Sequence, residues 1–277
     1  MAKPILPTKI EYEVDKENKN KGKIIIEPAS PGYGTTWGNT LRRVMLSSLE
    51  GAAVDAVKIK GVKYEYSTVP YVKEDVLDII LNLKLLRLKI LSEKEEPVKL
   101  SLKASGEKGV YARDITKDAR VEIVNPYLLI TTLTNKKARL EMDIWAKKGY
   151  GWVPSEEKSR EGIEIGTMVL DSTFSPVLNV AVNIENVRVG KRTDYDRLIL
   201  TIETDGTISP KEAFVSSARL LADQFKFLKD SAEKIAELGV ARKAKKAKKT
   251  KKTEKSAKKK PKRPRQAWPA KADKKKK

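Results

Sequence analysis

Short strand-like segments recur along most of this chain, and this pattern constrains its fold more than any other feature. The segments are rich in Val and Ile, often alternate apolar with polar residues, and are separated by Gly, Pro, Asn or Lys-Lys turns. They lie at residues 10–14, 23–28, 52–62, 98–104, 128–133, 138–146, 180–189 and 197–204. Strong helical periodicity occurs at residues 36–49, about 73–86 and 209 to about 238. Few helices among many strands predict an α+β fold with largely antiparallel sheets.

The third helical segment has a defined start and a long apolar seam. Ser209 can cap it, Pro210 suits its first position, and Glu212 completes a capping box. Apolar residues then recur at alternating spacings of four and three, at Phe214, Ala218, Leu221, Phe225, Leu228, Ala232 and Ile235. This heptad seam favours packing against another helix at a shallow angle. Burial against the chain's own sheet is an alternative that the periodicity leaves open.

The first helical segment follows a glycine-rich turn and has two faces. At about 100° per residue, one stripe collects residues suited to a core. Its members are Trp37, Leu41, Val44, Met45 and Ser48. Leu46 falls on the opposite side, between Arg42 and Arg43, where water is expected. An apolar side chain flanked by guanidinium groups is typical of an interface core, although single exposed leucines are also common.

Three glycines precede or open this helix, at positions 32, 34 and 38. Their spacing, G-x-G-x-x-x-G, is one residue longer than the dinucleotide-binding fingerprint, and Pro28 and Pro31 interrupt the strand that should lead into it. The chain also lacks the alternating strands and helices of a doubly wound sheet. We therefore expect these glycines to permit positive φ angles at the entry to the helix.

The composition excludes several kinds of chemistry. The 277 residues include no Cys and no His, so disulfides, thiolate or imidazole zinc sites, a Cys nucleophile and a Ser-His pair are all excluded. Acidic residues at 74, 75 and 78, and at 194 and 196, lack a loop with convergent oxygen ligands. The first three fit a solvated helix face near its N-terminus, and Arg192 can pair with Asp194. We therefore expect no metal site.

No apolar run approaches the length of about 20 residues that spans a bilayer, and the N-terminus lacks the apolar region of a signal peptide. The absence of Cys also suits a reducing compartment. These features predict a soluble, cytoplasmic protein with no membrane partner.

The net charge of +21 belongs almost entirely to the C-terminal tail. Residues 241–277 hold 20 Lys and Arg against two acids, which leaves 38 against 35 in residues 1–240. Because the tail has almost no apolar content, we expect residues 239–277 to be disordered, apart from a possible helix continuation near Ala241. Such a tail can bind DNA or nascent RNA without sequence preference, and Trp268 could stack on a base. A purely solubilising or localising tail is the alternative.

Three stretches of the sequence resemble the α subunit of bacterial and plastid DNA-directed RNA polymerase. They are GYGTTWGNTLRRVMLSSLEGAAV from residue 32, EYSTVPYVKEDVLDIILNLK at 65–84, and DSTFSPVLNVAVNIENVRVGKRTDYDRLILTIETDGTISPKEA at 171–213. They occur in the family's order and extend the resemblance over nearly all of residues 1 to about 228. Trp37 departs from the leucine usual in the family, but it stays on the core stripe.

The resemblance implies two subdomains. Residues 1–50 and 174–232 would form a dimerisation subdomain of helices on an antiparallel sheet, and residues 51–173 an inserted, mainly β subdomain. The seam on the third helix would then be a homodimer contact made by Phe214, Leu221, Phe225 and Leu228. The compact C-terminal domain that reads upstream promoter DNA in the family has no counterpart in the tail. Sequence-selective promoter recognition by this chain is therefore not expected.

The resemblance also implies a function in transcription. The chain would be a non-catalytic subunit of a nucleotidyltransferase, needing no cofactor, with the catalytic magnesium held by the β′ subunit. Arg43, Leu46 and Asp78 match positions that contact the β subunit. Lys84 and the segment from Leu170 to Val177 match positions linked to β′. The protein would act in the cytoplasm, or in the plastid stroma if it is organellar.

Two other functions remain open from the residues alone. One is a stand-alone nucleic-acid-binding protein that uses the basic tail. The other is a nucleotide-dependent enzyme that uses the glycine turn at 32–38. In that case, nucleotide should raise the thermal stability of the isolated protein.

Overall fold

The computed structural model describes residues 5–92, 96–159, 164–190 and 192–257. It is an α+β structure in which the strand pairs of these residues are antiparallel, as predicted. The chain forms two compact units, the first ending at Leu221 and the second beginning at Ala222. The first unit contains both sheets and both hydrophobic cores.

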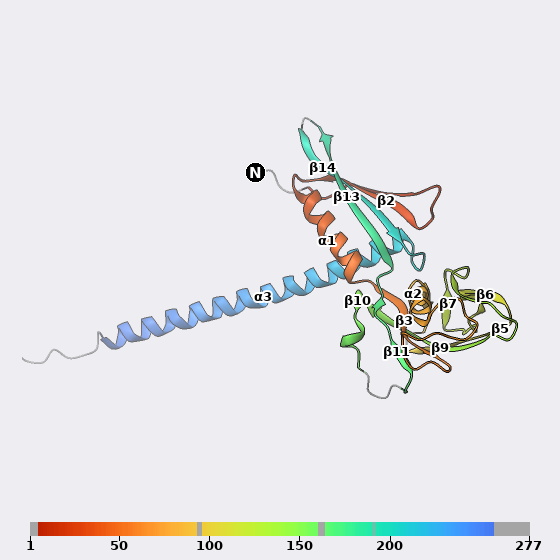
Figure 1. Cartoon of the computed structure of the whole chain (residues 1–277). Helices are drawn as coiled ribbons and strands as arrows, with labels where there is room; N and C mark the ends of the chain where they lie inside the picture. Colours follow the sequence, from red (N-terminus) through yellow and green to blue (C-terminus); the bar gives the residue numbers. More distant parts are fainter. Residues whose placement is uncertain (1–4, 93–95, 160–163, 191, 258–277) are drawn as a thin grey trace, which may run out of the picture. The chain divides into compact units, whose positions relative to one another are not determined.

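A four-stranded sheet joins the two ends of the first unit. Its strands are β1 (Lys9–Val14), β2 (Lys21–Ala29), β13 (Val177–Val189) and β14 (Arg192–Thr204), in the spatial order β1-β2-β14-β13. Helix α1 (Tyr33–Ser47) lies across β13 and β14 (Figure 1). The core between helix and sheet contains Met45, Leu198, Leu200 and Ile202. Segments at opposite ends of the sequence therefore share one core.

The glycines of α1 have two different roles. Gly32 precedes the helix with a φ of 82°, as expected. Gly34 and Gly38 lie inside the helix and are buried against the sheet, so the expectation of a positive φ is wrong for both. A Cβ atom on Gly38 would lie 2.5 Å from Val182 Cγ1 and 3.0 Å from Leu198 Cδ1. These two glycines thus allow a close approach of helix to sheet.

A second sheet has six strands, and its core is larger. Its strands are β3 (Glu50–Ile59), β4 (Leu88–Ile90), β5 (Val98–Ser105), β7 (Val121–Ile123), β9 (Arg139–Tyr150) and β11 (Thr167–Val169). Two short ribbons accompany it, β6 (Lys108–Tyr111) with β8 (Leu129–Leu133), and β10 (Trp152–Val153) with β12 (Ser172–Thr173). Two 3₁₀ turns, η1 (Ala112–Asp114) and η2 (Ser155–Glu157), complete this region. The separate sheets and cores fit two subdomains. The subdomain boundaries near residues 50 and 174 remain a prediction.

Helix α2 (Val76–Lys84) belongs to this second core and is shorter than the predicted 73–86. The helix begins later than predicted because Asp75 caps its N-terminus: the Asp75 carboxylate accepts the Asp78 amide at 2.7 Å. Val76, Ile79, Ile80 and Leu83 are buried beneath it. The apolar face of α2 is therefore filled by large side chains.

Helix α3 (Pro210–Ala257) begins as predicted. Ser209 Oγ accepts the Glu212 amide at 3.2 Å, and the Glu212 carboxylate accepts the Ser209 amide at 2.9 Å. The helix continues to Ala257, which differs from the predicted disorder from residue 239. Ala and Lys are strong helix formers, and a helix satisfies its own backbone hydrogen bonds without an apolar core. The rest of the tail, including Trp268, lies outside the described residues.

Candidate subunit interface

The face of α1 that points away from the sheet carries the arginines singled out in the sequence. Arg42 and Arg43 are exposed. In the last turn of the helix, Ser47 Oγ donates a hydrogen bond to the Arg43 carbonyl at 2.8 Å. Leu46 is half-buried and packs against the first core, so the expectation that it lies fully in water is wrong. The chain turns directly from α1 into β3, and the core extends there to Leu49. Leu46 therefore sits at the edge between core and surface.

The β10–β12 ribbon lies beside the end of α1 (Figure 1). Trp152 pairs with Thr173 and Val153 with Ser172. Gly151, with a φ of 60°, approaches α1 so closely that a Cβ atom would be 3.3 Å from the Ser47 carbonyl oxygen. Its own carbonyl accepts the Phe174 amide at 2.7 Å. The ribbon thus presents Trp152, which is 62% exposed, next to the last turn of α1.

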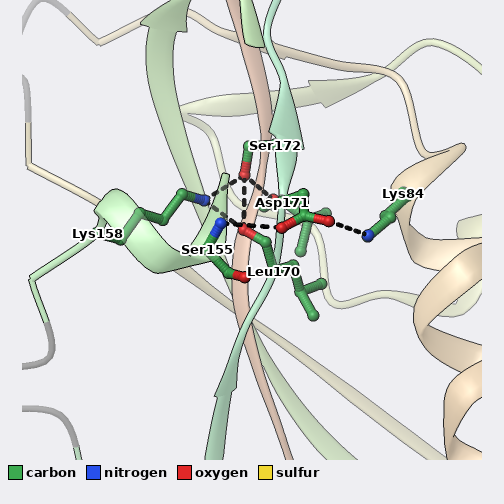
Figure 2. A network of polar contacts seen from close by, with 7 residues as sticks. Lys84, Ser155, Lys158, Leu170, Asp171 and Ser172 are labelled. Atoms are coloured by element: carbon green, nitrogen blue, oxygen red, sulfur yellow. Dashed lines mark hydrogen bonds and ion pairs between the residues drawn. The ribbon is translucent and has the colours of Figure 1, made fainter. Parts of the chain in front are cut away.

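Two lysines hold the segment that leads into β12 (Figure 2). From α2, Lys84 Nζ donates to Asp171 Oδ2 at 3.1 Å, and the other Asp171 oxygen accepts the Ser155 amide at 2.9 Å. The Ser155 amide, and after it Lys84, lower the pKa of Asp171 to about 2. Asp171 is therefore a carboxylate at neutral pH and ties α2 to η2.

The second lysine, Lys158, is nearly buried, with 11% of its side chain exposed. Its ammonium group donates to the Leu170 carbonyl at 2.5 Å and to Ser172 Oγ at 2.6 Å, and it pairs with Asp55 at 2.7 Å. Ser172 Oγ in turn donates to the Val54 carbonyl at 2.7 Å. A lysine has three donors, so this set satisfies the buried charge completely.

Comparisons with known proteins match this architecture to a family. The model of the RNA polymerase Rpb3/RpoA insert domain matches residues 57–175, which include most of the six-stranded sheet. The DNA-directed RNA polymerase subunit alpha of Symbiobacterium thermophilum is 46% identical over 243 residues, covering 88% of this chain and 75% of that protein. That of Oceanobacillus iheyensis is 45% identical over 238 residues, covering 85% and 74%. This chain belongs to the α-subunit family of DNA-directed RNA polymerase. It is accordingly a subunit of that nucleotidyltransferase complex, which acts in transcription.

In this α-family chain, the residues predicted to contact β and β′ differ in how exposed they are. Asp78 is exposed in the first turn of α2, whereas Lys84 is half-buried and ion-paired. Leu170 and Val177 are only 3% and 4% exposed, one in each core. Their side chains pack inside the chain, which corrects the expectation that they lie on a contact surface. Within the segment they bound, Thr173 is the exposed residue.

The seam of the α-family helix α3 changes character along its length. Phe214, Ala218 and Leu221 are half-buried against the first core, so burial on the chain's own sheet applies to them. In the second unit, Phe225 is 61% exposed and Leu228 is 59% exposed. Among the residues whose exposure is described, the seam from residue 225 to residue 235 is thus an exposed apolar stripe.

The acidic residues have structural partners. Arg192 pairs with Asp194 at 2.6 Å, as predicted, and buried Asp196 accepts the Gly34 amide at 3.0 Å. Glu74 is half-buried and accepts the Thr132 amide at 2.7 Å, so it is not on a solvated helix face. Burial raises the pKa of Glu74, but hydrogen bonds from Thr132 and Thr131 outweigh it and lower the pKa overall.

Among the described residues, no group of three or more acidic side chains is arranged to hold a metal ion. None of the helices in the described part of the chain is long and apolar enough to cross a membrane.

The sequence did not single out exposed Trp152 or nearly buried Lys158. Trp152 stands in the run GYGWVP, where an aromatic between a glycine turn and a proline is a weak signal. The acceptors of Lys158 come from residues 55, 170 and 172, and no local pattern connects them.

Proposed function

We propose that this chain is a non-catalytic α subunit that pairs with a second copy and on which the β subunit, and then the β′ subunit, assemble. The exposed seam of α3 carries this proposal: Phe225, Leu228 and Ile235 are 61%, 59% and 70% exposed. Contiguous exposed apolar side chains at heptad spacing are typical of helices that pair with another helix. A dimer would remove this stripe from water.

Replacing Phe225 with Glu tests the pairing, because a carboxylate at the centre of the seam would be buried without a partner. We expect F225E to sediment as a monomer. Lys226→Glu is the matched control: it introduces the same side chain at the next position, which lies off the seam, and should leave the dimer intact. A stable F225E dimer would show that the seam is not the contact between copies.

The large-subunit contact is proposed to centre on Arg43 and Leu46 of α1, with Asp78 on the same surface. An exposed arginine beside an aliphatic group is a frequent hot-spot arrangement, and truncating such an anchor costs about 2 kcal/mol or more. Arg43→Ala should therefore give a folded dimer that no longer captures β. Arg113→Ala, which truncates another exposed arginine, in η1, should capture β normally. Loss of the dimer itself in R43A would contradict the assignment.

The β′ contact is proposed to involve Lys84 and the segment 170–177. Because Leu170 and Val177 are buried, this segment would reach β′ through exposed Thr173, supported from behind by the Lys84–Asp171 ion pair. In this arrangement the chain supplies no catalytic residue or cofactor, and the catalytic magnesium belongs to β′. The complex would act in the cytoplasm, or in the plastid stroma.

The Lys-rich tail is proposed to add non-specific affinity for DNA. Its 20 basic residues against two acids would release condensed counterions from the phosphate backbone. Deleting residues 241–277 should therefore make template binding by the assembled polymerase less dependent on salt. An unchanged salt dependence would remove the tail from DNA binding.

The same charge favours one alternative function, a stand-alone nucleic-acid-binding protein. Purifying the tagged chain from its native cell distinguishes the two. Two large co-purifying protein partners, as the family resemblance implies, support the assembly role. Nucleic acid without large protein partners supports the alternative.

A further inference from the structure

We propose that Trp152 is an aromatic anchor for the β subunit, on one continuous surface with Arg43 and Leu46, and that Lys158 positions it. This inference rests on the proposed function, since it adds contact residues to the same assembly surface. The β10–β12 ribbon, the end of β9 and the last two turns of α1 supply this surface.

No side-chain contact in the described part of the chain explains the exposure of Trp152. Its side chain is 62% exposed, and within the described residues it makes neither a ring contact nor a side-chain hydrogen bond. Tryptophan is among the residues most enriched at binding hot spots, because it buries a large apolar area and carries one hydrogen-bond donor. We read this solvent-facing indole as half of a contact that a partner completes.

Trp152 is continuous with the arginine-bearing face of α1. Gly151 packs against the Ser47 carbonyl, and Ser47 Oγ is bonded to the carbonyl of Arg43 one turn earlier. Tyr150, 59% exposed, lies on the other side of Gly151 and donates to Glu50 at 3.3 Å. The short run Tyr150–Trp152 thus lies beside the end of α1, one turn after Arg43 and next to the start of β3.

The charge of this surface indicates the chemistry of its partner. Arg42 and Arg43 have no ion pair within the part of the chain that is described, whereas Glu50 is paired with Lys148 at 3.2 Å. The α1 side of this surface is therefore positive, whereas exposed Glu156 and Glu157 make the η2 side negative. It fits an apolar pocket whose rim is acidic where it faces α1. Trp152 pairs with Thr173, which is proposed above to reach β′, so the two contact regions adjoin at this ribbon. Because Gly151 packs against Ser47 in the last turn of α1, one turn after Arg43, we assign the indole to β, and the β′ measurement below tests this choice.

Lys158 fixes the ribbon from behind. Its bonds to the Leu170 carbonyl and Ser172 Oγ hold the strand that pairs with Trp152 and Val153 (Figure 2). Asp171 adds a second tie, to the Ser155 amide just after the ribbon. Holding an anchor in its bound position lowers the conformational entropy lost on binding. Lys158 touches no partner in this scheme and acts only through the position of Trp152.

The test uses the full-length dimer and purified β subunit. Trp152→Ala should weaken β capture by about tenfold or more while sedimentation still shows a dimer. Tyr66→Ala, which removes another aromatic that is 88% exposed, should bind β like the wild type. Normal β capture by W152A alongside failed capture by R43A would overturn this inference and leave the proposed function standing. Failure of the wild-type dimer to capture β would overturn both, and weakened capture of β′ alone would overturn the assignment to β.

A double-mutant cycle tests the role of Lys158. Lys158→Met should weaken β capture, but in the W152A background it should cause little further loss, because its effect passes through Trp152. If Lys158 had a purely structural role, the double variant would lose β affinity by the product of the two single losses, and this outcome would overturn the positioning role. Thermal unfolding shows whether K158M is folded; if it is not, Ser172→Ala, which removes one acceptor of Lys158, replaces it in the cycle.

Discussion

Helices α1 and α2 each lie on an antiparallel sheet, but they contact it in opposite ways. Helix α1 places Gly34 and Gly38 against β13 and β14, so backbone meets side chains directly. Helix α2 places Ile79, Ile80 and Leu83 into a large core. The first contact depends on the absence of Cβ atoms, and the second depends on apolar volume.

The polar contacts of the two helices differ as well. Around α2, Asn82 donates to the Ile130 carbonyl at 2.9 Å, Lys84 pairs with Asp171, and Glu74 accepts the Thr132 amide. For α1, the Gly34 amide donates to Asp196. Helix α2 is thus tied at both ends and in the middle, whereas α1 keeps its outer face open. The helix with the open face is the one that carries the proposed β contact.

The largest effect is expected in the α2 core. Leu83→Ala deletes a fully buried side chain and should lower the free energy of unfolding by about 2–5 kcal/mol. Leu81→Ala, on the exposed face two residues earlier, should change it by only about 0.5 kcal/mol. Urea unfolding measures both. Equal losses in the two variants would mean that α2 is not held by its buried volume.

Gly38→Ala should have the next largest effect. Its Cβ would overlap Val182 Cγ1, so helix or sheet must shift, at a cost of about 1–3 kcal/mol. The better helix propensity of Ala offsets about 1 kcal/mol of that cost. Asn39→Ala, exposed on the same helix, should be neutral or slightly stabilising. If G38A were as stable as N39A in urea, the close approach would not matter.

Local sequence patterns predicted the parts of this fold that local interactions determine. The capping box at Ser209 and Glu212 is confirmed because its members lie three residues apart. The α+β class is confirmed because strand alternation is also a local property. The roles of Gly34 and Gly38 could not be predicted, since their neighbours Asp196 and Val182 lie more than 140 residues away.

The candidate site shows the same limit. The arginines of α1 are exposed as their periodicity predicted. Leu46 is half-buried because the core extends beyond the end of the helix, a tertiary effect that periodicity does not contain. Leu170 and Val177 are buried although the resemblance places them in a contact segment, because family positions identify a segment and not the direction of each side chain.

The loops before the two helices provide a smaller test. Gly32 takes a φ of 82° before α1, but before α2 the comparable angle of 63° falls on Tyr71. A left-handed conformation costs a residue with a side chain about 1–2 kcal/mol, and burial offsets only part of this cost at Tyr71, which is 52% exposed. Tyr71→Gly should therefore raise the free energy of unfolding by about 1 kcal/mol. Tyr66→Gly, without a positive φ, should lower it, and a loss in Y71G would indicate a packing role.

The smallest effect on stability is expected from the ion pair between Asp171 and Lys84 of α2. Because the folded state lowers the pKa of Asp171 to about 2, its stabilisation is complete above the ordinary value near 3.8 and is lost as pH falls between these values. Asp171→Asn should be slightly less stable than the wild type at pH 7, with a difference that shrinks toward pH 2. Lys84→Met should raise the pKa of Asp171 only partly, since the Ser155 amide is the larger cause. Carboxyl NMR titration measures this value, and an unshifted pKa in K84M would mean that the ammonium group contributes nothing.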